Sequence, residues 1–111
     1  MRISLAALLT IVPAALAAEI YVPAAEALAA AVDKPVPERP PLARQMRLRG
    51  TVAAQVRISE KGNVEEVRIV QGNALLASGV TRTLKAWKFK PFESGGKPVV
   101  ALTTLRFSFK P

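Results

Sequence analysis

The sequence contains no cysteine and no histidine among its 111 residues. Without cysteine, neither a disulfide nor a thiolate metal site can form, so the fold depends on its core alone. Without histidine, the chain lacks the commonest general base, zinc ligand and pH-sensitive side chain. These two absences exclude a Ser-His-Asp or a Cys-His catalytic site within this chain.

Acidic residues are scarce as well, with 8 Asp and Glu against 16 Lys and Arg. Glu65 and Glu66 are neighbours on a predicted strand, so they point to opposite faces and cannot act on one substrate. Glu60 and Glu93 lie in predicted turns, where a solvated carboxylate is ordinary. Because no acid–base pair is assembled, we predict that the protein is not an enzyme, and we expect no cofactor and no metal ion.

The scarcity of acidic residues leaves a net charge of +8. Residues 34–111 hold 15 basic and 5 acidic residues, which makes this part of the chain +10. Such a surface attracts nucleic acid, anionic lipid or an acidic protein. We do not expect nucleic acid, because Trp87, Phe89 and Phe107 fall at core positions rather than forming a stacking platform. A basic surface that serves only solubility is the open alternative.

The N-terminus has the pattern of a secretory signal peptide. Arg2 precedes an apolar run over residues 3–16, and Ala15-Leu16-Ala17 is an A-x-A cleavage site. The run is shorter than the roughly 20 apolar residues that span a bilayer. We therefore interpret residues 1–17 as a cleaved signal, with an uncleaved membrane anchor as the alternative. Export is a second argument against nucleic acid as the partner.

Residues 18–39 are first alanine-rich and then proline-rich, which predicts a linker. A short helix can begin at Ala24, after Pro23, but the sequence shows no partner for it. The domain proper then covers residues 40–111, about 70 residues, and a core of that size gains from association. We therefore keep a homodimer as an open alternative.

Hydrophobic periodicity and turn residues divide this domain into two helices and three strands. In chain order they are a helix at 41–48, strands at 51–59 and 64–71, a helix at 73–87 and a strand at 99–109. Gly50 is expected to end the first helix, and Gly62 to supply the positive φ of a hairpin turn. Val64 is out of phase with its strand, which predicts an irregular start.

The second helix has the clearest pattern. Asn73 is a good N-cap, and Leu76, Val80, Leu84 and Trp87 form one apolar stripe. Pro91 prevents Lys90 from staying helical, so the chain runs extended after Trp87. We predict an α+β fold, a small three-stranded antiparallel sheet packed against two helices on one face.

Five short motifs follow one another at ordered spacings. They are Arg-Pro-Pro-Leu-Ala at 39–43, Gly-Thr-Val at 50–52, Gly-Asn-Val at 62–64, Trp-Lys-Phe-Lys-Pro at 87–91 and Gly-Lys-Pro-Val at 96–99. On these motifs, residues 34–111 resemble the C-terminal domain of TonB-family proteins. Energy transducers of that family carry a membrane-spanning helix with a histidine and a long Pro-rich spacer. This chain instead resembles a short form with a signal peptide.

The resemblance implies a non-catalytic periplasmic module, related to energy-transducing transmembrane transport, that captures a partner peptide by strand addition beside its last strand. The implied partner is a segment of an outer-membrane transporter or another protein of the cell envelope. Our candidate partner-binding residues are the outward positions of that strand, together with two residues before the first helix. They are Val100, Leu102, Thr104, Arg106, Arg39 and Pro40.

A second function stays open. The protein could instead be a structural or electrostatic envelope protein that binds an anionic membrane surface or self-associates. This alternative depends on the positive charge rather than on the last strand.

Overall fold

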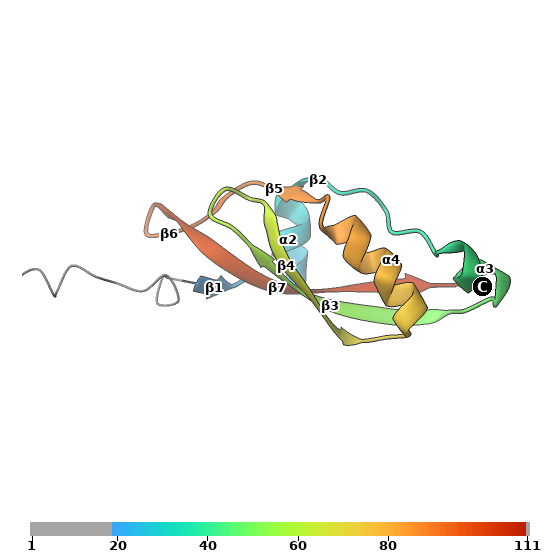
Figure 1. The fold of residues 1–111 in the computed structure, drawn as a ribbon. Helices are drawn as coiled ribbons and strands as arrows, with labels where there is room; N and C mark the ends of the chain where they lie inside the picture. The colour runs from blue at the N-terminus through green and yellow to red at the C-terminus, as the bar shows by residue number, and fades with distance from the viewer. Residues whose placement is uncertain (1–18, 111) are drawn as a thin grey trace, which may run out of the picture.

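The computed structural model of the chain describes residues 19–110. Residues 1–17, which we interpret as a signal peptide, lie outside the described residues. An antiparallel sheet forms its centre, with β3 (Gly50–Ile58) between β4 (Val64–Gln71) and β7 (Lys97–Phe109). These are the three strands that the sequence predicts. Figure 1 shows the helix α4 (Ala74–Leu84) lying across this sheet.

The core lies between α4 and one face of the sheet. Along β3, the alternating residues Val52, Ala54, Val56 and Ile58 are completely buried, as predicted. The side chain of Asn73 caps α4 by accepting hydrogen bonds from the backbone N–H groups of Leu75 and Leu76 at 2.8 and 3.4 Å. The apolar stripe predicted for α4, formed by Leu76, Val80 and Leu84, is buried in the core. Trp87 continues the stripe beyond the helix and is buried as well. The α+β prediction is confirmed.

The hairpin between β3 and β4 also agrees with the sequence. Gly62 has a φ of +89°, which suits the predicted turn. The pairing register of the two strands shifts between Arg57 and Ile58, where Val64 joins the ladder. This irregularity confirms the prediction for Val64.

The sheet has more strands than predicted. β6 (Phe92–Ser94) forms a hairpin with β7 through Gly95 and Gly96, whose φ values of +62° and +80° are typical of a type I′ turn. β7 therefore begins two residues before its predicted start. A separate pair joins β2 (Ala31–Asp33) to β5 (Lys88–Phe89).

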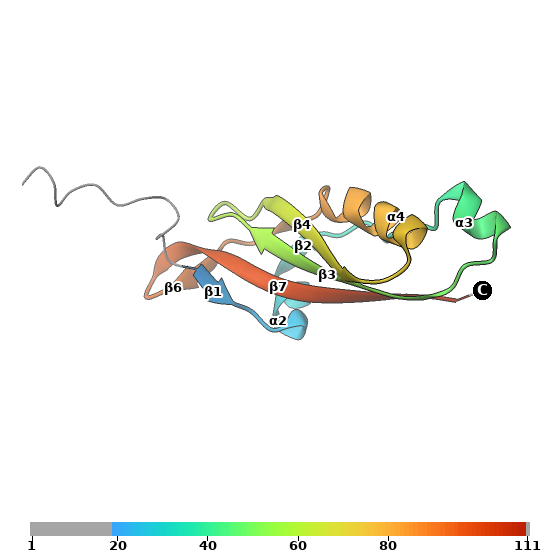
Figure 2. The same cartoon turned by 60° about the horizontal axis from the view of Figure 1, so that its bottom comes forward.

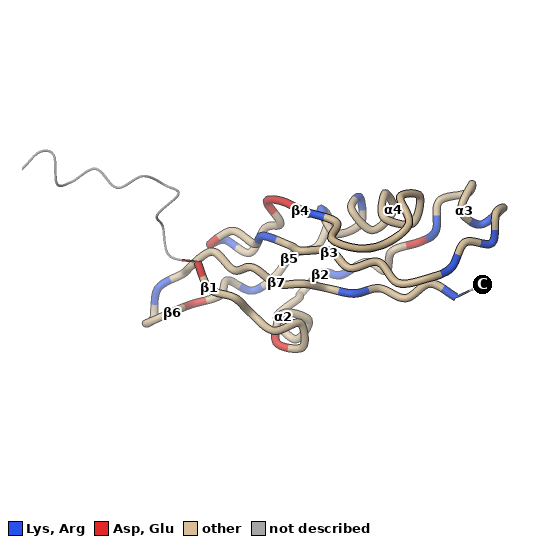
Figure 3. The backbone as a smooth tube through the Cα atoms, turned by 90° about the horizontal axis from the view of Figure 1, so that it is seen from below, with Lys and Arg blue, Asp and Glu red and all other residues tan. Residues whose placement is uncertain are grey.

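The predicted linker is wrong for residues 19–33. These residues form β1 (Glu19–Tyr21), α2 (Ala24–Ala30) and β2, and α2 begins where the sequence predicts a short helix. The sequence shows no packing partner for α2, but the structure does: Val22 and Ala27 are buried in the hydrophobic core. Figures 2 and 3 place α2 beside β7, whereas α4 lies over β3 and β4. The fold thus has a third helix, at the edge of the sheet.

The first predicted helix is shorter than expected. α3 covers only Pro41–Gln45, and Arg47, two residues further on, has a φ of +54°. The N–H of Leu48 donates a hydrogen bond to the carbonyl of Ala43. The N–H of Arg47 donates one to the carbonyl of Arg44. This is the Schellman arrangement, in which the left-handed residue is usually glycine. Arg47 therefore ends the helix, and Gly50 instead begins β3.

Candidate functional site

The candidate site is the edge of β7 that faces away from β3. On this outer edge, the carbonyl of Leu102 accepts a hydrogen bond of 2.8 Å from the N–H of Val22. Backbone groups of alternate strand residues point to the same side of the strand. The N–H and C=O groups of Thr104, Arg106 and Ser108 therefore point to the outer edge as well.

Much of this edge is open. β1 pairs with β7 only from Val100 to Leu102. Within residues 19–110, no strand pairs with the outer edge from Thr104 to Ser108, although β3 pairs with the other edge throughout. An unpaired row of N–H and C=O groups is a template for another extended chain.

The four candidate residues on β7 share one face of the strand, opposite the core face. Arg106 is exposed, while Leu102 and Thr104 are half-buried. Val100 lies on this outward face as well, but its side chain is only 9% exposed. β1 pairs alongside this position, with Glu19 opposite Val100.

Arg39 and Pro40 lie elsewhere. They belong to residues 34–40, which run along α4 without helix or strand. The guanidinium of Arg39 donates to the carbonyl of Leu48 at 3.2 Å, and Pro40 precedes the first residue of α3. A Cβ on Gly79 would lie 2.7 Å from the carbonyl oxygen of Glu38, so this stretch is packed closely against α4. Both residues therefore hold the fold together, and the structure does not bring them to the open edge.

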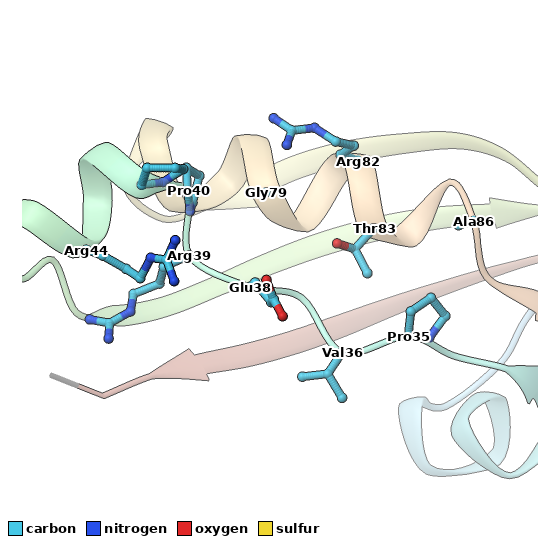
Figure 4. A pocket seen from close by; sticks show the side chains of 11 residues that line it. Pro35, Val36, Glu38, Arg39, Pro40, Arg44, Gly79, Arg82, Thr83 and Ala86 are labelled. Carbon is cyan, nitrogen blue, oxygen red and sulfur yellow. The ribbon is translucent and has the colours of Figure 1, made fainter.

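An open cavity of about 490 Å³ lies between this stretch and α4. Figure 4 shows Arg39 and Arg44 close together at one end and Arg82 pointing away from them. Glu38 contributes the one carboxylate of the lining. With Arg39, Arg44 and Arg82 against this one carboxylate, the lining is predominantly basic.

Two further observations concern the described residues as a whole. No helix within residues 19–110 is both long and apolar enough to cross a membrane. In the same range, no group of three His, Cys, Asp or Glu residues could hold a metal ion.

β1 and its contacts were not predicted from the sequence. Glu19 forms an ion pair with Arg57 of β3, and the hydroxyl groups of Tyr21 and Thr104 lie 2.9 Å apart. The alternation of Ile20 and Val22 before Pro23 is a strand signal, but it is too short to stand out beside the alanine-rich stretch.

Comparisons with known proteins agree with this architecture. The family of Gram-negative bacterial TonB protein C-terminal domains matches residues 35–111, more than half of the chain. The solution NMR structure of the Pseudomonas aeruginosa TonB C-terminal domain is similar, with a TM-score of 0.62 and 24% sequence identity. That similarity covers 73% of this chain and 84% of the other. No curated protein sequence matches significantly. The chain belongs to the family of TonB C-terminal domains.

Proposed function

We propose that this protein captures an extended segment of a partner protein by strand addition to the outer edge of β7. The observation that carries the proposal is the open row of backbone groups at Thr104, Arg106 and Ser108. Backbone hydrogen bonds would supply affinity, and neighbouring side chains would select the sequence of the segment.

The family supports a role of this kind. TonB C-terminal domains are periplasmic, non-enzymatic interaction domains related to transport. By this relation, the proposed partner is the N-terminal segment of an outer-membrane transporter, or another protein of the envelope. The protein would act outside the cytoplasmic membrane, either free after signal cleavage or held by an uncleaved anchor.

Replacing Thr104 by proline tests strand addition. Proline removes the outward N–H of this residue but no hydrogen bond to β3, so the fold is expected to persist. Binding of a peptide from a transporter N-terminal segment, followed by fluorescence anisotropy, is expected to weaken at least tenfold.

The matched control is Thr104→Ser, which keeps both the N–H and the hydroxyl group. It is expected to bind like the unmodified protein. Unchanged peptide binding by Thr104→Pro, with a circular dichroism spectrum like that of the control, would exclude strand addition at this edge. Sedimentation of each variant shows whether a second copy of the chain uses the same edge.

A second function is favoured by one specific feature, the basic end of the molecule. Figure 3 shows basic positions gathered where α3 and the C-terminus lie. Arg44, Arg47, Arg49 and Lys110 are all exposed there. A surface of this kind would bind anionic lipid headgroups.

If the basic end binds membranes, vesicles containing anionic lipid should bind the protein at low salt. Binding should fall steeply as salt screens the charges. The double change of Arg47 and Arg49 to glutamine should reduce vesicle binding. Arg68→Gln on β4 is the control, because it removes one positive charge away from the basic end. Absence of vesicle binding at low salt would exclude this second function.

A further inference from the structure

The chain already places a strand of its own on the proposed binding edge. β1 pairs in parallel with β7, with Glu19 opposite Val100, Ile20 opposite Ala101 and Tyr21 opposite Leu102. Figures 1 and 2 show β1 lying alongside β7 at this point. It uses the same row of backbone groups that continues from Thr104 to Ser108, where no strand of residues 19–110 pairs with it.

The side chains of β1 also occupy the outward face of the site. Glu19 pairs with Arg57, which makes a second, longer ion pair of 3.6 Å with Glu65. The hydroxyl of Tyr21 lies 2.9 Å from that of Thr104, the first residue of the open stretch. A partner strand that covered both Leu102 and Thr104 would therefore have to replace these contacts.

The contacts that hold β1 are suited to being exchanged. The strand is three residues long, and Tyr21 is 63% exposed. The side chains of Glu19 and Arg57 are 30% and 34% exposed, and ion pairs and hydroxyl hydrogen bonds between such partly exposed groups contribute little stability. Within β1, Ile20 is partly buried against the core, and the fully buried residues Val22 and Ala27 follow it. Release of β1 therefore exposes Ile20 and breaks the hydrogen bond from the N–H of Val22 to the carbonyl of Leu102, while Ala27 keeps α2 in place.

We infer that β1 is an internal competitor for the partner site, a strand of the chain itself that must be displaced before a partner segment pairs along the full outer edge of β7. With β1 in place, the open edge offers Thr104, Arg106 and Ser108. With β1 released, the backbone groups of Val100 and Leu102 become part of the open edge of β7. The edge is then longer than a typical strand of five to six residues. This inference rests on the proposed function, because it concerns the same edge.

A reversible lock on β1 tests the inference. Because Tyr21 and Leu102 are partners across adjacent strands, their Cα atoms should lie about 5 Å apart, within the range that a disulfide bridges. The double change Tyr21→Cys and Leu102→Cys adds the only two cysteines of the chain. Oxidation is expected to weaken binding of the transporter peptide at least tenfold relative to the same protein after reduction, which is the matched control.

A release variant gives the opposite test. Glu19→Lys with Tyr21→Phe removes the ion pair to Arg57 and the hydroxyl contact to Thr104, and should strengthen binding of the same peptide by about tenfold. The control is Glu26→Lys with Tyr21 unchanged. It makes the same change in charge on the exposed face of α2, and should bind like the unmodified chain.

The outcomes separate the two proposals. Equal peptide affinity of the locked, reduced and released proteins, with binding lost in Thr104→Pro, would overturn the internal competitor and leave strand addition standing. Absence of peptide binding even in the release variant would overturn strand addition itself. Weaker binding on oxidation together with tighter binding on release supports both.

Discussion

Replacing Gly62 by alanine is expected to destabilise the fold by about 3 kcal/mol or more. Gly62 has a φ of +89°, and a Cβ at this position would overlap the backbone carbonyl of Phe89. Phe89 also donates its N–H to the carbonyl of Gly62 at 2.9 Å, so the turn and β5 are held face to face. The clash is with backbone, and no side-chain rotation relieves it. β5 must therefore move away from the hairpin.

A second glycine separates the cost of the clash from that of the backbone conformation. Gly95 also has a positive φ, of +62°, but a Cβ there would meet no atom within 4 Å. Gly95→Ala is therefore expected to cost only about 1 kcal/mol. Urea unfolding of the two variants, followed by circular dichroism, measures the difference. Equal losses would contradict the close approach of Phe89 to the hairpin.

Replacing Trp87 by alanine is the second change with a large expected effect, about 3–5 kcal/mol. The side chain is buried between Phe89 and Phe107, whose ring centroids each lie 5.9 Å from that of the tryptophan. Its indole N–H donates to the carbonyl of Pro35 at 2.9 Å. One side chain thus joins the end of α4, the last strand and the stretch before α3.

Trp87→Phe is the control for this prediction. Phenylalanine keeps an aromatic ring in the core but leaves the carbonyl of Pro35 without its donor, so the expected cost is about 1–2 kcal/mol. Because Trp87 is the one tryptophan of the chain, unfolding should be followed by circular dichroism rather than by fluorescence. If both variants lose the same stability, the hydrogen bond rather than the packing is the main contribution of Trp87.

Most of the fold can be predicted from the sequence because its signals are local. Each signal depends only on residues that are close together in the chain. Examples are the alternation along β3, the apolar stripe of α4 and the cap at Asn73. The wrong details have identifiable causes. Arg47 ends α3 in a conformation that usually requires glycine, so nothing in the sequence marks the position. The extra strand β6 is three residues long and contains no alternation to detect.

The candidate site was predicted only in part. Alternation places Leu102, Thr104 and Arg106 on one face of the last strand, and the structure agrees. The burial of Val100 was not predicted, because its neighbour on the edge, Glu19, is 81 residues away in the chain. Arg39 and Pro40 belong to a motif of the family, but their contacts are with Leu48 and α4.

By itself, the sequence determined the class of the fold, its three central strands, the buried face of α4 and the absence of histidine and cysteine chemistry. These follow from periodicity, turn residues and composition, which do not depend on distant parts of the chain. Only the tertiary structure decided which part of the β7 edge is open and which part β1 covers. Any extended segment can supply N–H and C=O groups to an edge. Which segment does so depends on the path that α2 and the following stretch take around the sheet.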